Sequence, residues 1–130
     1  MNKRILTMSA LAGILILFPL EALAALCWTD NFGATYSIEV GPGSGSTMLL
    51  HGFRKPGVGS CSVAPVTGSA FILNPTTALV GWRTQSIDPP NGCVGFHETL
   101  TVQLATLLMT GNFRNDVGIE GINKLTPSAC

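Results

Sequence analysis

The residues of this 130-residue chain that could support catalysis are few and scattered. His51 and His97 could act as general bases and several serines as nucleophiles, but there is no nucleophile elbow and nothing holds a Ser, a His and an Asp together. His97 and Glu98 are adjacent, so on a strand they point to opposite faces and cannot form an acid–base pair. We therefore do not expect an enzyme.

Two further patterns suggest chemistry that their spacing argues against. Residues 41–45 resemble a nucleotide-binding loop, but the glycine spacing differs and no helix follows, so we expect a hairpin turn. The four cysteines, Cys27, Cys61, Cys93 and Cys130, include no CxxC pair. Metal binding is therefore not expected either.

An N-terminal leader indicates export. Lys3 and Arg4 precede an uncharged apolar run over residues 5–20, and Ala22-Leu23-Ala24 supplies a small-residue cleavage site. Pro19 and Glu21 interrupt this run, so it is shorter than the roughly 20 apolar residues of a membrane-spanning helix. This argues against a retained membrane anchor. Leu26 stands where a small residue should precede a lipidated cysteine, which argues against lipidation of Cys27. We expect residues 1–24 to be a cleaved signal peptide and residues 25–130 to form a single domain of a secreted or periplasmic bacterial protein.

In an oxidising compartment an even number of cysteines is expected to form disulfides. Three pairings of Cys27, Cys61, Cys93 and Cys130 are open from the sequence. Because Cys27 begins the mature chain and Cys130 ends it, we favour a bridge between these two, which leaves Cys61 and Cys93 to join two loops. The nearly balanced charge gives no electrostatic footprint for nucleic acid or an anionic membrane, so we expect neither as a partner.

Alternating polarity between turn-forming residues predicts an all-β fold. The expected strands are residues 34–40, 47–54, 66–73, 77–85, an extended apolar stretch over 96–109 with a bend at Ala105, and a closing strand at 121–125. Turns or loops are expected at 41–46, 55–61, 74–76, 88–93 and 111–116. Thr99, Thr101 and Gln103 alternate with Leu100, Val102 and Leu104, as in a half-buried strand. The pattern predicts a meander barrel.

Several short motifs lie along the mature chain. They are Trp28, Asp30-Asn31 and Gly33-Ala34-Thr35; Gly52-Phe53; Cys61 with Pro65-Val66-Thr67-Gly68; Val80-Gly81-Trp82; Cys93; and Gly121-Ile122-Asn123 with Leu125. These motifs resemble those of the avidin family, especially its short, dimeric rhizavidin-type members, and the first group resembles the family's opening strand. The resemblance implies an antiparallel up-and-down β-barrel of the avidin or lipocalin kind, stapled by disulfides. It also implies a homodimer, no cofactor, and biotin or a related small molecule as ligand.

The resemblance also implies a set of ligand-binding positions: Asp30, Ala34, Phe53, Trp82, Leu100, Thr106 and Asn123. Asp30, Ala34 and Phe53 replace three of the family's donors to the ureido oxygen of biotin, whereas Asn123 could still accept from a ureido N–H. Trp82 keeps one aromatic wall, and Leu100 and Thr106 stand where two other tryptophans are expected. Asp30 in a pocket would be a buried acceptor for an N–H group or a positive charge, and otherwise a solvated turn residue.

Departures from the family leave a second interpretation open. After Leu100 the sequence is short, so we expect a strand or its hairpin to be trimmed. Trp28 is expected to plug the core, Phe53 and Leu108 to fill the barrel, and Glu98 to be a solvated strand residue. A barrel filled by Leu100 and Phe53 would act instead through its outer surface, as a protein-interaction or inhibitor module.

Overall fold

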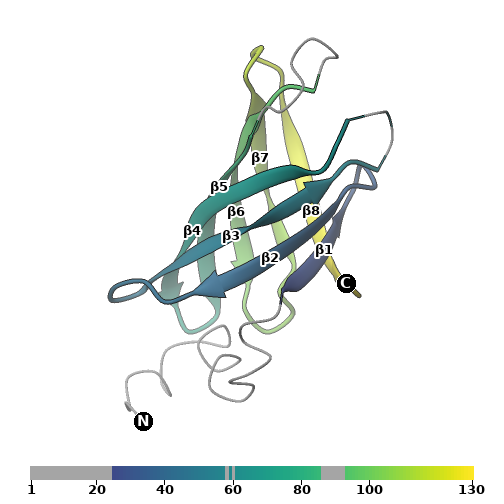
Figure 1. Ribbon diagram of the computed structural model, residues 1–130. Coiled ribbons are helices and arrows are strands. Elements are labelled where there is room, and N and C mark those ends of the chain that lie inside the picture. The colour runs from purple at the N-terminus through teal and green to yellow at the C-terminus, as the bar shows by residue number, and fades with distance from the viewer. Residues whose placement is uncertain (1–24, 58, 60, 86–92) are drawn as a thin grey trace.

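The protein is a closed β-barrel. The computed structural model describes residues 25–57, 59, 61–85 and 93–130, so the expected signal peptide and most of the loop at 88–93 lie outside the described residues. The strands are β1 (Leu26–Asp30), β2 (Thr35–Gly41), β3 (Thr47–Lys55), β4 (Ala64–Asn74), β5 (Thr77–Thr84), β6 (Phe96–Gln103), β7 (Met109–Asn115) and β8 (Glu120–Ser128). Each pairs antiparallel with the next, and β8 pairs with β1 (Figure 1). The predicted all-β meander barrel is confirmed.

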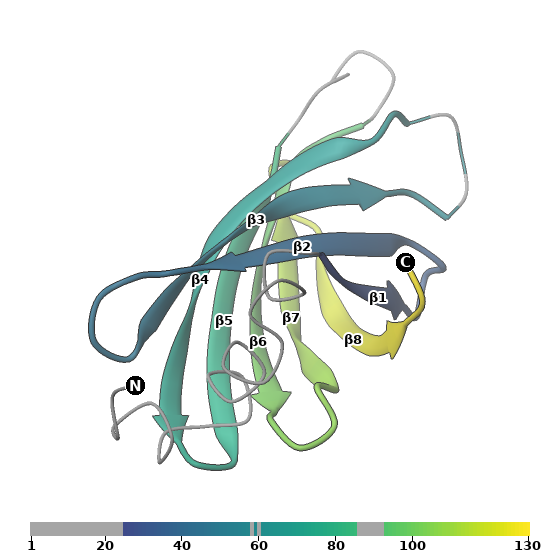
Figure 2. The same ribbon diagram turned by 60° about the horizontal axis from the view of Figure 1, so that its bottom comes forward.

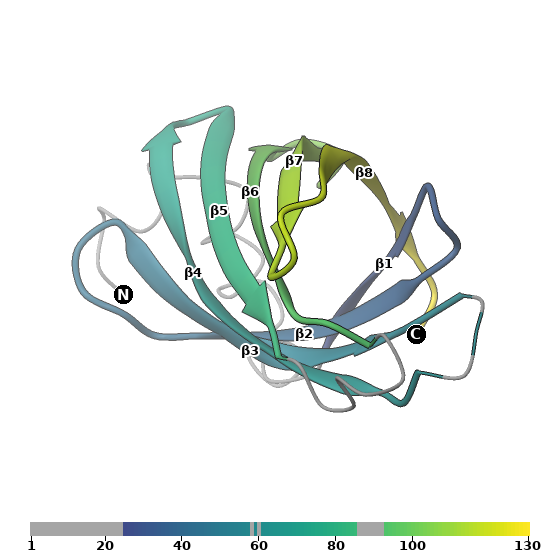
Figure 3. The ribbon, with the colours of Figure 1, turned by 90° about the horizontal axis from the view of Figure 1, so that it is seen from above.

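Strict alternation along the strands builds a single interior. Tyr36, Ile38 and Val40 of β2 are buried, and so are Leu100 and Val102 of β6, whereas the residues between them are exposed or half-buried. Seen from above, the strands surround this interior (Figure 3). Gly52 and Gly68 occupy inward positions where a Cβ would lie within 2.1 Å of a neighbouring strand's carbonyl oxygen. Glycine at these positions therefore lets the strands coil tightly enough to close the barrel.

Several sequence predictions about strand boundaries need correction. The stretch 96–109 contains β6, a turn after Gln103 that includes the expected bend at Ala105, and the start of β7, so no strand is trimmed. Residues 111–116, expected as a loop, lie largely in β7, where Gly111 pairs with Leu100 on one side and Asn123 on the other. The motif that resembles one opening strand is divided between β1 and β2 by a turn containing Gly33, whose φ is 83°.

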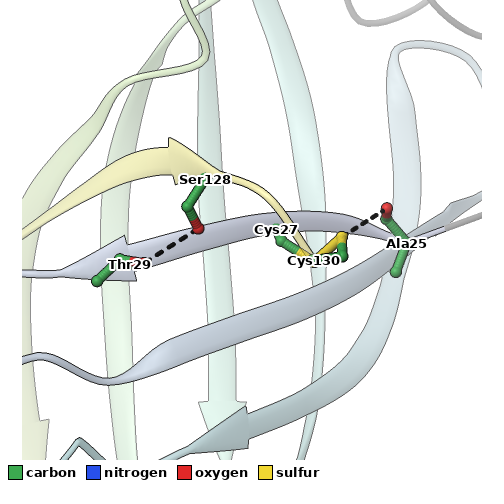
Figure 4. Close-up of a disulfide and its surroundings, with 5 residues drawn as sticks. All are labelled: Ala25, Cys27, Thr29, Ser128 and Cys130. Atoms are coloured by element: carbon green, nitrogen blue, oxygen red, sulfur yellow. Dashed lines mark hydrogen bonds between the residues drawn. A yellow bond between two sulfur atoms is a disulfide. The ribbon is translucent and has the colours of Figure 1, made fainter.

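Two disulfides fasten the barrel in the favoured pairing. Cys27 bonds to Cys130 and Cys61 bonds to Cys93. Beside the first bridge, Thr29 Oγ1 donates a hydrogen bond to Ser128 Oγ across β1 and β8 (Figure 4). The terminal bridge therefore reinforces the seam where the barrel closes.

The two ends of the barrel differ. At one end Trp28, 3% exposed, closes the interior, and its Nε1 donates to the carbonyl oxygen of Leu107 at 2.8 Å. Trp28 is thus the core plug that the sequence predicted. The β2–β3 hairpin projects away from the barrel at this end (Figures 1 and 2). No helix long and apolar enough to cross a membrane occurs among the described residues.

Candidate ligand-binding site

The opposite end of the barrel holds an open cavity of about 220 Å³. It lies among the ends of β1, β3, β6 and β7 and the connections that follow or precede them. Its lining is Asp30, Phe32, Arg54, Val94, Phe96, Phe113, Asn115 and Asn123. The cavity thus combines an aromatic wall with a few polar groups, which is the usual composition of a small-molecule site.

Below the cavity, the Glu98 carboxylate is the centre of a buried polar network. Glu98 is 1% exposed, although it was expected to be a solvated strand residue. Its Oε1 accepts hydrogen bonds from Trp82 Nε1 at 2.8 Å and from the Tyr36 hydroxyl at 2.9 Å, and its Oε2 accepts from Asn123 Nδ2 at 2.6 Å. Donors from β5, β2 and β8 therefore stabilise this charge in the barrel interior.

One carboxylate oxygen of Asp30 fixes a turn, and the other joins the polar network at the cavity. Its Oδ1 accepts from the backbone N–H groups of Phe32 and Ala34, both at 2.9 Å, and so fixes the β1–β2 turn. Its Oδ2 accepts from Asn123 Nδ2 at 3.3 Å and lies 3.8 Å from Arg54 Nη2. Since Asp30 is 6% exposed, it is a buried acceptor rather than a solvated turn residue.

The Arg54 guanidinium lines the cavity and lies against aromatic rings. Its Cζ lies 4.9 Å from the centroid of Phe96 and 5.6 Å from that of Tyr36, both within cation–π range. Its Nε donates to the Tyr36 hydroxyl at 3.1 Å. Arg54 therefore joins the aromatic wall to the carboxylates below it.

Tyr36 links the two carboxylates and is held in its protonated form. Burial and, next, the charge of Glu98 raise the pKa of the Tyr36 hydroxyl far above its ordinary value. Its ring stacks on Trp82 with centroids 5.4 Å apart and an interplanar angle of 18°. The hydroxyl is thus a fixed donor to Glu98 at neutral pH.

The structure brings some of the seven predicted site residues together and separates others. Asp30 and Asn123 line the cavity, Ala34 lies in the turn fixed by Asp30, and Trp82 lies beneath the cavity against Glu98. Leu100, 1% exposed, packs in the apolar core.

Phe53 and Thr106 are placed away from the cavity. Phe53 is 56% exposed on the outer face of β3, because the pleat turns its neighbour Arg54 inward. It therefore does not fill the barrel. Thr106 is exposed in the β6–β7 turn, at the end closed by Trp28. Leu108, in the same connection, is half-buried.

Sequence reasoning missed Tyr36, Arg54 and Glu98 as site residues. Alternation was the signal that could have found them. Glu98 shares its face of β6 with Leu100, Arg54 its face of β3 with Leu50, and Tyr36 its face of β2 with Ile38. A polar residue in phase with a buried apolar row must itself point inward.

Neither histidine approaches the cavity. His51 pairs with Glu39 on the outer surface at 3.3 Å, and His97 lies near Arg83, also outside. Within the described residues, no hydrogen bond joins either imidazole to a serine or threonine hydroxyl. The same part of the chain contains no cluster of side chains suited to a metal ion.

The architecture is that of an avidin-like barrel. The chain superimposes on the crystal structure of bradavidin with a TM-score of 0.60 and 15% identity, covering 82% of this chain and 81% of bradavidin. The crystal structure of the rhizavidin–biotin complex superimposes with a TM-score of 0.55 and 17% identity, covering 82% of this chain and 93% of rhizavidin. A redesigned β-barrel, mFAP1, bound to DFHBI, superimposes with a TM-score of 0.51 and 16% identity, covering 83% of this chain and 96% of mFAP1. No protein-family model and no curated protein matches the sequence. At such identities, the similarity establishes the fold.

Proposed function

We propose that this protein is an exported binding protein, not an enzyme, that holds a small molecule in the open cavity. Biotin or a related compound is the candidate ligand. The observation that carries the proposal is the cavity itself, an aromatic wall above buried hydrogen-bonding groups at the open end of an avidin-like barrel. Rhizavidin, which shares the fold, binds biotin in the compared structure.

The cavity offers both kinds of group that a cyclic urea requires. The Arg54 guanidinium is a donor for a ureido oxygen, and Asp30 Oδ2 is an acceptor for a ureido N–H. Phe32, Phe96 and Phe113 form an apolar wall against which a ring can pack, with Phe32 and Phe113 edge to face at 5.8 Å. Trp82, in contrast, is covered by Glu98 and does not line this cavity.

Export is part of the same proposal. Both disulfides require an oxidising compartment to form and persist, which fits removal of residues 1–24 and release to the periplasm or the exterior.

A second candidate function, association with a protein through the outer surface, is favoured by an exposed apolar face. Leu49, Phe71, Leu73 and Leu79 project from β3, β4 and β5, and each is at least 40% exposed. Phe71 and Leu79 are direct cross-strand partners. The expected occupant is a second copy of the chain, in keeping with a homodimer. Sedimentation velocity of the wild type and Phe71→Asp tests this: a dimer abolished by the charge supports it, and a wild-type monomer at high concentration refutes it.

Calorimetric titration of the oxidised protein with biotin tests the primary function. Phe32 lines the cavity and is 51% exposed, whereas Phe71 is 47% exposed on the outer face, so the two alanine variants form a matched pair. We expect saturable binding that weakens about tenfold in Phe32→Ala, since truncating an aromatic contact costs about 1–2 kcal/mol, and is unchanged in Phe71→Ala. Absence of heat and of a thermal shift with biotin would remove it as the ligand.

A further inference from the structure

The charges at the floor of the cavity do not balance. Asp30 and Glu98 are two buried carboxylates, and Arg54 is the single cation that contacts their network among the described residues. Trp82, Tyr36 and Asn123 donate to the carboxylates but carry no positive charge. The site therefore has an excess negative charge in a low-dielectric interior, where a second cation is attracted most strongly.

Arg54 shows what kind of cation the site accommodates. Its guanidinium is planar, lies over Phe96 and Tyr36, and is directed at Asp30. Phe113 is in contact with Phe96 and Phe32 and lines the same cavity, so further aromatic surface faces the empty volume. A second planar cation entering the cavity would meet aromatic rings at its faces and Asp30 at its edge.

Thr84 adds a polar group with unused bonding capacity. Its Oγ1 is buried without a hydrogen-bond partner among the described residues, and Thr84 pairs across strands with Phe96 of the cavity wall. Buried hydroxyls are usually hydrogen-bonded, so this one leaves a polar atom unsatisfied next to Phe96, although Thr84 itself does not line the cavity.

We propose that the ligand carries a planar cationic group, an amidinium or guanidinium, on a small apolar body, with the cation directed at Asp30 and the body against Phe113. This inference rests on the proposed small-molecule function and assigns to the same cavity a ligand class other than biotin, which carries no cationic group. An anionic group placed beside Asp30 is disfavoured, because it would add a charge of the same sign as the uncompensated carboxylate. The charge of the bound group, rather than its shape, determines selectivity.

Three probes of nearly equal shape test the inference: benzamidine, which is cationic at pH 7, neutral benzamide and anionic benzoate. We expect calorimetry on the oxidised protein to show benzamidine binding at least about tenfold more tightly than benzamide, with benzoate weakest. Equal affinity for benzamidine and benzamide, or a preference for benzoate, overturns the inference while leaving a small-molecule site. Binding of biotin with no binding of benzamidine also overturns it and leaves the proposed function intact.

Charge-neutral variants locate the selectivity. Asp30→Asn keeps the size of the side chain and an oxygen for the turn, and should bring the ratio of benzamidine to benzamide affinity close to one. Asp116→Asn is the matched control, because Asp116 is exposed and paired with Arg83 outside the cavity. Glu98→Gln, with exposed Glu39→Gln as its control, provides a second pair should Asp30→Asn fail to fold. Unchanged selectivity in both folded cavity variants contradicts the inference.

Discussion

Removal of two buried hydroxyl groups should change stability in opposite directions. The Tyr36 hydroxyl donates to the buried Glu98 carboxylate at 2.9 Å and accepts from Arg54 Nε at 3.1 Å. Tyr36→Phe deletes these bonds and the longer contacts of the hydroxyl with Asp30 Oδ2 at 3.4 Å and Asn123 Nδ2 at 3.5 Å, and keeps the ring stacked on Trp82. Hydrogen bonds to charged groups contribute about 1.5–3 kcal/mol, and Arg54 can turn toward solvent, so we expect a loss of about 2 kcal/mol in the free energy of unfolding.

Thr84→Val provides the matched comparison. Thr84 Oγ1 is buried and lacks a partner in the described part of the chain, so valine removes a desolvated hydroxyl at nearly constant volume. We expect a gain of about 1 kcal/mol.

Urea unfolding of both oxidised variants, with m-values equal to that of the wild type, measures the two changes. A loss of less than about 0.5 kcal/mol for Tyr36→Phe would refute the role given to the Glu98 network, because surface substitutions already reach that size. A loss in Thr84→Val would mean that its hydroxyl is bonded.

Three further predictions concern the bridges, the tyrosine and the outer face. The double variant Cys61→Ser/Cys93→Ser should lose about 4 kcal/mol in urea unfolding, because the bridge closes a loop between residues 32 apart; wild-type stability in this variant would show that the bridge constrains little. Since Tyr36 is the chain's single tyrosine, tyrosinate absorbance reports on it alone. Its raised pKa makes the stability it contributes fully present below pH about 10 and lost above it, so absorbance should rise only together with unfolding; a rise near pH 10 in folded protein would contradict its burial. Phe53→Ala should leave biotin and benzamidine affinities unchanged in calorimetry, whereas Phe113→Ala lowers both; the reverse order would place the site elsewhere.

The barrel could be predicted from the sequence because its signals are local. Alternation along residues 34–40, 47–54, 66–73 and 77–85, with glycine and proline between them, gave strands close to β2, β3, β4 and β5. The β6–β7 hairpin could not, because its connection is apolar and lacks a glycine or proline. There Leu107 adopts a φ of 61°, and its carbonyl oxygen accepts from Trp28, a partner 79 residues away. Backbone hydrogen bonds from Thr106 and Leu107 to the Gln103 carbonyl oxygen form this turn, and the tertiary contact with Trp28 holds it against the barrel.

The site was less predictable because its contacts are non-local. Glu98 is an acid between His97 and Thr99, and only donors from three other strands, at Tyr36, Trp82 and Asn123, make its burial favourable. Phe53 matches an aromatic residue of the avidin family by type, and this match alone predicts that it binds the ligand. The pleat of β3 instead turns Phe53 outward and directs Arg54 into the barrel. Register, more than residue type, determines which side chains meet in a barrel.

Chemical-shift mapping with isotopically labelled, oxidised protein tests the central claim most directly, since it locates a bound molecule without assuming its affinity. On addition of biotin or benzamidine, the largest amide shifts should gather at Phe32, Arg54, Phe96, Phe113 and Asn123, while the β2–β3 hairpin and Thr106 stay unchanged. Shifts confined to the outer face of β3, β4 and β5, or none at saturating concentrations of both molecules, would contradict a ligand site at the open end of the barrel.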